Sequence, residues 1–187
     1  MKKLISLLLC LVMILSVMTA CGGDDKSSSD TGIVGTWEAN VKLSDYEDMG
    51  DLGEMEEYLD LDKMVIGFTL KLTADGEYEL TVNSKSIDKL VDVMCDGMED
   101  YMKAVAKDAG MSYSDMLNAL GCSSIKDFLD QAGMLDEFEQ IKEQTEDGEY
   151  TWEDGVLTMD GDEVDASLKG NTLTIEREGI EFVFKRK

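Results

Sequence analysis

The stretch YTWEDGVLTMDGDEVDASLKGNTLTIEREGIEFVF, residues 150–184, alternates apolar and polar residues over most of its length. A period of two places the apolar side chains of a β-strand on one face of a sheet. Four turn signals interrupt the alternation, and they predict two-residue turns at Asp154–Gly155, Gly161–Asp162, Gly170–Asn171 and Glu178–Gly179. The stretch therefore predicts five consecutive antiparallel strands.

The predicted turns also set the pairing of these strands. In an antiparallel pair, inward residues must oppose inward residues. All four hairpins meet this condition, because the turns place the following apolar residues opposite each other: Trp152 and Leu157, Met159 and Val164, Leu168 and Leu173, and Ile175 and Phe182.

Residues 33–43, 64–72 and 77–83 show the same alternation, which brings the predicted number of strands to eight. Between the last two segments, a three-residue loop of Ala74, Asp75 and Gly76 sets Leu72 opposite Tyr78. The sequence T-x-D-G-E-Y occurs in this loop and again at residues 145–150. We interpret both copies as a turn followed by an inward tyrosine at the start of a strand. Eight antiparallel strands, each with one apolar face, predict a barrel.

Two segments break this alternation. Residues 44–62 begin with Ser44 and Glu47 at capping-box spacing, and their apolar residues follow a helical period. Residues 84–144 carry capping serines and helix-ending glycines that predict three or four short helices. If consecutive strands alternate in direction, both insertions leave the barrel at the same end. We therefore expect an α-helical cap over one mouth of the barrel.

The N-terminus predicts export. Lys2 and Lys3 precede a long uncharged apolar run, which is typical of a secretory signal peptide over residues 1–20. Residues 18–22, MTACG, resemble the lipobox of bacterial lipoproteins, and this resemblance implies cleavage before Cys21 and a diacylated N-terminal cysteine. Without cleavage, the same segment would still tether an exported protein. Residues 21–32 then form a lipidated, flexible tether at the outer face of the cell membrane.

The chain of 187 residues has 17 Lys and Arg against 41 Asp and Glu, a formal charge of −24. Loss of Lys2 and Lys3 with the signal peptide would give 15 − 41 = −26. Such acidity argues against nucleic acid and anionic lipid surfaces as partners. We expect a monomer that meets the membrane only through its lipid anchor. The chain has no histidine, which excludes Ser-His-Asp and Cys-His catalysis and histidine-ligated metals.

Residues 35–37, Gly-Thr-Trp, on the first of eight consecutive strands resemble the G-x-W signature of lipocalins. In that family a late basic residue packs over the tryptophan at the closed end, and Arg186 holds the matching position relative to Trp37. Residues 33–187 thus resemble the lipocalin-like lipoproteins of Gram-positive bacteria, which implies a calycin-type barrel that binds small, usually apolar molecules. The 61-residue helical insertion at 84–144 departs from compact lipocalins.

An eight-stranded barrel is either packed solid or holds one small ligand. The strand pattern places a ring of inward residues near the capped mouth: Val41, Met64, Ile66, Val82, Tyr150, Met159, Val164, Arg177 and Ile180. The cap adds Met94, Met98 and Met102, whose flexible side chains suit varied apolar shapes but also suit plain packing on the barrel. Arg177 is a candidate partner for a ligand carboxylate or phosphate. It could equally reach solvent or a carboxylate of the cap.

Other chemistries are weakly indicated. Met94, Cys95, Met98 and Met102 have the spacing of a Cu(I) site, but also that of a packed helix face. Cys95 and Cys122 would form a disulfide or remain thiols. The acidic segment 45–62 lacks EF-hand spacing, and the alternation sends strand carboxylates outward, away from any glycosidase-like pair. We expect no enzyme, cofactor or metal site.

Two functions are favoured, and a hydrolase that uses carboxylates of the two insertions is a third alternative, because the strand alternation does not constrain those side chains. The first is an extracytoplasmic lipoprotein whose barrel binds or carries a small apolar or amphipathic ligand. The second is an interaction module with a filled barrel, whose acidic helical cap docks a basic protein or cell-wall component.

Overall fold

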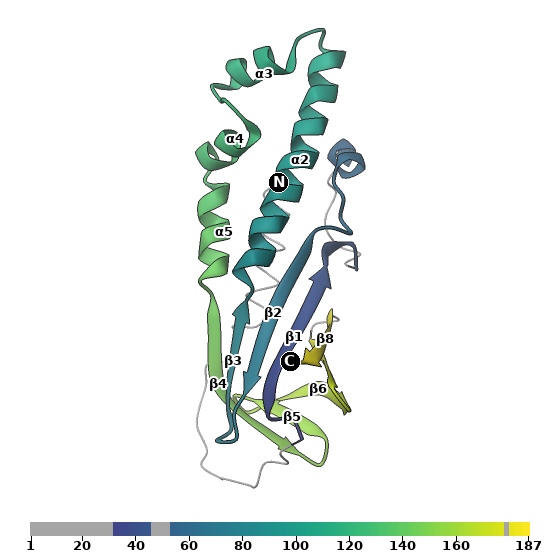
Figure 1. Ribbon diagram of the computed structural model, residues 1–187, viewed down its shortest axis with the longest axis vertical. Helices are drawn as coiled ribbons and strands as arrows, with labels where there is room; N and C mark the ends of the chain where they lie inside the picture. The colour runs from purple at the N-terminus through teal and green to yellow at the C-terminus, as the bar shows by residue number, and fades with distance from the viewer. Residues whose placement is uncertain (1–31, 46–52, 178–179) are drawn as a thin grey trace. The chain divides into compact units, whose positions relative to one another are not determined.

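The computed structural model describes residues 32–45, 53–177 and 180–187 and shows a closed, eight-stranded antiparallel barrel (Figure 1). The strands follow one another around the barrel in chain order, as the alternation predicted. Their bounds are β1 Gly35–Lys42, β2 Val65–Leu72, β3 Glu77–Val82, β4 Thr145–Glu153, β5 Val156–Met159, β6 Asp162–Lys169, β7 Thr172–Arg177 and β8 Ile180–Arg186. Cys21 and the predicted signal peptide lie outside the described residues.

The described chain divides into two compact units. The barrel unit comprises residues 32–41, 67–83 and 144–187. The helical unit comprises residues 42–66 and 84–143, so it contains both predicted insertions. That the helices cap a mouth of the barrel stays a prediction.

Three of the four C-terminal pairings are confirmed. Trp152 pairs with Leu157, Leu168 with Leu173, and Ile175 with Phe182. The turn at Glu178–Gly179 itself lies outside the described residues. The Ala74–Gly76 loop is also confirmed, because Leu72 pairs with Tyr78.

The pairing between β5 and β6 was predicted wrongly. The turn residues are Asp160 and Gly161, so Leu157, not Met159, pairs with Val164. Both turn residues have positive φ, 50° for Asp160 and 91° for Gly161. Such a turn matches the right-handed twist of the two strands. Moving the turn by one residue shifts the pairing by two, so inward residues still face inward.

The two T-x-D-G-E-Y copies adopt different structures, contrary to the sequence interpretation. In the first copy Gly76 has φ 82° and ends the loop before β3. The second copy lies within β4, where Gly148 pairs with Tyr78 and Asp147 pairs with Glu79. Residues of the two copies therefore pair with each other across β3 and β4.

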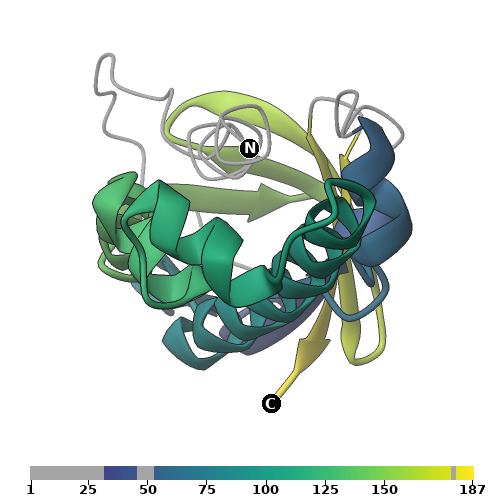
Figure 2. The same cartoon turned by 90° about the horizontal axis from the view of Figure 1, so that it is seen from above.

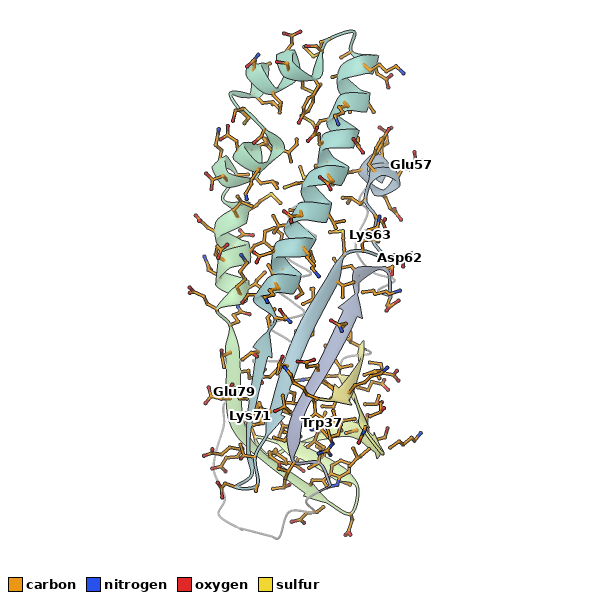
Figure 3. All side chains as sticks on the ribbon, viewed as in Figure 1. Trp37, Glu57, Asp62, Lys63, Lys71 and Glu79 are labelled. Atoms are coloured by element: carbon orange, nitrogen blue, oxygen red, sulfur yellow. The ribbon has the colours of Figure 1, made fainter. Side chains whose placement is uncertain are left out.

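Trp37 on β1 pairs with Arg186 on β8, and the predicted contact between them is confirmed (Figure 3 labels Trp37). Trp37 is fully buried, and the Arg186 guanidinium carbon lies 4.3 Å from the centre of its ring. Arg186 also donates hydrogen bonds to the carbonyls of Val34, at 2.7 Å, and Gly32. Gly35 leaves room for this arrangement, because a Cβ there would lie 2.9 Å from Arg186 Nη1.

The helical unit is built around one long helix. α2, Ser84–Asp108, has 25 residues, so the prediction of only short helices was wrong for it. α3 Tyr113–Leu120, α4 Ile125–Gln131 and α5 Met134–Lys142 lie along it (Figures 1 and 2). The predicted caps are confirmed: Ser112 accepts from the Asp115 amide and Ser124 from the Asp127 amide. Among the described helices, none has the length and apolarity that crossing a membrane requires.

The first insertion forms short 3₁₀ turns where it is described. These are η1 Leu43–Asp45 and η2 Gly53–Tyr58, and Glu47 of the predicted capping box lies outside the described residues. η2 packs on α2 at Gly97, where a Cβ would lie 2.5 Å from the Tyr58 carbonyl oxygen. The glycine therefore allows the two backbones to approach.

Replacing Arg186 with Met should lower the free energy of unfolding by about 2 kcal/mol, because it removes the cation–π contact and leaves two carbonyls without their donor. Chemical denaturation followed by tryptophan fluorescence measures this. Lys185→Met, which changes the exposed neighbour on the same strand, is the control. Equal stability of the two variants would contradict a structural role for Arg186.

Candidate functional site

The barrel interior contains a small cavity with two charged groups in an otherwise apolar wall. The apolar lining residues are Phe68, Leu70, Leu80, Met159, Val164, Ile175, Phe182 and Phe184. The rings of Phe68 and Phe182 meet edge to face at 5.6 Å, and Phe184 stacks on Phe182 at 6.3 Å. The two charged lining residues are Glu146 on β4 and Arg177 at the end of β7.

The free space in this cavity is small. The hollow measures about 450 Å³ when the open space at its mouth is included, but the centre of a water molecule can move in only about 20 Å³. The value of about 20 Å³ decides which molecules the cavity can hold, because it leaves out the space that belongs to open solvent. It is close to the minimum for one water molecule. A larger molecule therefore enters only if a lining side chain moves.

Glu146 faces inward because β4 begins at Thr145 and positions 146, 148, 150 and 152 share one face. One carboxylate oxygen, Oε1, lies 3.1 Å from the Tyr78 hydroxyl. The other oxygen, Oε2, is buried and has no hydrogen-bond partner within the described part of the chain. A buried carboxyl oxygen without a partner is costly while the group is charged.

Burial raises the pKa of Glu146 to about 7. The Tyr78 hydroxyl and the positive charge of Arg177 both oppose this rise, and the negative charge of Asp160 adds to it. Glu146 therefore changes its charge near neutral pH, which is unusual for a glutamate.

Asp160 lies at the β5–β6 turn and is the second carboxyl group that contacts the Tyr78 hydroxyl. Its Oδ2 accepts a hydrogen bond from the Tyr78 hydroxyl at 2.7 Å, and its Oδ1 accepts one from the Glu149 amide at 3.0 Å. The carboxylate rests on Gly148, where a Cβ would lie 2.8 Å from the Asp160 carboxyl carbon. The glycine of the second motif copy is thus needed for space and not for a turn.

Arg177 supplies the positive charge of the cavity wall. It acts on Glu146 through its charge, but among the described residues no ion pair or hydrogen bond of its guanidinium is found. Its donors are therefore available to a bound molecule.

The structure brings together only part of the predicted ring. Arg177, Met159 and Val164 line the cavity, whereas Val41, Met64, Ile66, Val82 and Ile180 do not. Met64 and Ile66 are buried residues of the helical unit, as are Met94 and Met98 of α2; Met102 is half-buried there.

Tyr150 was placed wrongly at the mouth. Its hydroxyl donates to the Thr73 carbonyl at 2.7 Å, and its amide donates to Gly76, so it packs on the β2–β3 loop. The reason is that β4 starts at Thr145, which puts Tyr150 in the middle of that strand.

Sequence reasoning missed Glu146, Tyr78 and Asp160 as a cluster. The assumption that strand carboxylates all face outward is wrong for Glu146. Extending the alternation of Tyr150 and Trp152 backwards by two steps would have identified Glu146 as inward. Cys95 and Cys122 are unpaired thiols, and burial raises the pKa of Cys95.

No protein-family model, no curated protein and no solved structure matches this chain.

Replacing Glu146 with Gln should change how stability depends on pH. The pKa of Glu146 is higher in the folded state, about 7, than its ordinary value of 4.5. The folded wild-type protein therefore binds more protons between these values, and it loses stability relative to Glu146→Gln as the pH rises from about 4.5 to about 7. Urea unfolding across this range measures the difference. Glu149→Gln, an exposed carboxylate on the same strand, is the control. Parallel curves for wild type and Glu146→Gln would contradict the buried-carboxyl assignment.

Replacing Gly148 with Ala should cost about 1–3 kcal/mol, because the new methyl group displaces the Asp160 carboxylate. In an Asp160→Ala background the obstacle is gone, so the same replacement should cost much less. Unfolding measurements on the two single variants and the double variant give the coupling. Additive effects would show that Gly148 matters for some other reason.

Proposed function

We propose that this protein is an extracytoplasmic lipoprotein whose barrel binds a small amphipathic ligand. The observation that carries the proposal is the cavity wall, in which eight apolar side chains surround one acidic and one basic group. Such a combination suits a molecule with an apolar body and one polar end. The lipobox-like MTACG at residues 18–22 supports anchoring at the outer face of the membrane.

Ligand entry requires a side chain to move, given the small free volume. Met159 is the best candidate among the lining residues, because its unbranched side chain has several rotatable bonds and adapts to different shapes. The three phenylalanines are held by mutual ring contacts and form the fixed part of the wall.

A second function is supported by the same small volume, which also suits a barrel that is simply filled. In that case the protein would work through its surface, by docking a partner. Four aspartates, Asp88, Asp92, Asp96 and Asp100, repeat every four residues along the exposed face of α2. Asp88 pairs with Lys142 and Asp100 with Lys103, so Asp92 and Asp96 are the members of this stripe that would dock a basic protein or cell-wall component.

Native mass spectrometry of the purified protein, before and after exposure to a lipid and metabolite extract, tests the first function. We expect a reproducible excess mass. Val164→Phe should abolish it, because the added ring fills a cavity with little free space. Ser167→Phe places the same ring on the exposed face of the same strand and should leave the excess mass in place.

Both variants must melt as cooperatively as wild type for the comparison to count. A clean, unchanged mass in every sample would contradict ligand binding and favour the docking function. Partner binding through the aspartate stripe would then weaken steeply with ionic strength.

A further inference from the structure

We propose that the polar end of the cavity takes an amphipathic molecule with a single negatively charged head group, and that Glu146 takes up a proton when this molecule binds. The inference rests on the proposed ligand-binding function and names the class of ligand and its linkage to pH.

The Tyr78 hydroxyl lies between two carboxyl groups. Its oxygen lies 2.7 Å from Asp160 Oδ2 and 3.1 Å from Glu146 Oε1. A phenol has one proton, so it cannot donate fully to two carboxylates at once. Both contacts become hydrogen bonds when a carboxyl group supplies a second proton. Each oxygen of Asp160 already has a donor, because Oδ1 accepts from the Glu149 amide and Oδ2 from the Tyr78 hydroxyl. Glu146, with an unpartnered buried oxygen, is therefore the group that carries the proton.

The charged groups of the cavity wall decide which head group the cavity attracts. Arg177 and Glu146 are the charged residues of the cavity wall, whereas Asp160 accepts a hydrogen bond from Tyr78 and is not among the lining residues. With Glu146 protonated, the wall carries the single positive charge of Arg177. With Glu146 ionised, the two charges cancel. The two charged lining residues therefore never sum to a negative charge. Asp160 adds a negative charge outside the lining, but Arg177 lines the cavity and is the cation that a head group meets there, so it attracts an anionic head group and repels a cationic one.

An anionic head group, in contrast, is attracted to Arg177 and is repelled by an ionised Glu146 across the same small cavity. The low-dielectric apolar wall strengthens both effects. An anion accordingly binds the protonated form of Glu146 more tightly, and by linkage its binding raises the proton affinity of Glu146. Tyr78 on β3, Asp160 at the β5–β6 turn and Arg177 on β7 are the groups that act on Glu146 in this equilibrium.

Because the pKa of Glu146 in the free protein is about 7, the affinity for an anion is highest below this value and falls above it. Between about pH 6 and about pH 8 the dissociation constant of a permanently charged anion should rise about tenfold. A permanently charged cation should show the opposite trend or no binding.

Two probes with the same alkyl chain and opposite, non-titrating charges test this: decanesulfonate and decyltrimethylammonium, used below their micelle concentrations. Isothermal titration calorimetry at the two pH values gives the affinities. Repeating the titration in two buffers with different ionisation enthalpies counts the protons taken up. We expect decanesulfonate to bind with uptake of about half a proton at about pH 7, and more tightly than decyltrimethylammonium.

Variants separate the roles of the two residues. Glu146→Gln should remove the proton uptake and make decanesulfonate binding independent of pH over this range. Arg177→Gln should weaken decanesulfonate binding at both pH values. Glu149→Gln, an exposed carboxylate on the same strand as Glu146, should keep the tenfold pH dependence.

The outcomes distinguish this inference from the proposed function. Tighter binding of the cation, or anion binding without proton uptake, would overturn the inference and leave a ligand-binding barrel. A pH dependence that persists in Glu146→Gln would also overturn it. Binding of neither amphiphile by the folded protein would overturn both the inference and the proposed function.

Discussion

Pairing of β1 with β8 is the constraint on which the interior depends. It joins Trp37 to Arg186, so the first and last strands meet and no sheet edge is left open at that seam. Closure gives every strand one face toward the interior and one toward solvent. It also places Arg186 over the buried indole of Trp37, where the guanidinium donates hydrogen bonds to two backbone carbonyls. The same closure half-buries Glu146 in the wall of a cavity with little free space, and this burial raises the proton affinity of its carboxyl group.

The fold could be predicted from the sequence because each strand of the barrel alternates and each turn contains residues that tolerate positive φ. The error at β5–β6 shows the limit of this reasoning. Residues 160–162 read Asp-Gly-Asp, and both possible two-residue turns contain the glycine. Only the three-dimensional structure shows that Asp160 adopts the left-handed conformation and folds its carboxylate back onto Gly148.

The candidate site could be predicted only in part. Arg177 and Met159 were identified because they lie on inward positions near strand ends. Glu146 was missed because the identical letters around Asp75 and Asp147 were assumed to have identical structures. Local sequence permits either a loop or a strand at T-x-D-G-E-Y, and tertiary pairing decides between them. The cluster of Tyr78, Glu146 and Asp160 joins three separate segments, so no spacing in the sequence could have revealed it.

The arrangement of α2 and α5 also bears on how the barrel assembles. Pairing of Thr81 with Thr145 joins strands that are separated by the whole second insertion, and closing a flexible loop of that length is entropically costly and slow. Lys142 near the end of α5 forms an ion pair with Asp88 near the start of α2, at 2.6 Å. The folded helices therefore bring the end of the second insertion back to its beginning. If the helical unit forms first, it brings the end of β3 and the start of β4 close together. Pairing of these two strands then closes only a short loop, although the strands are far apart in the sequence.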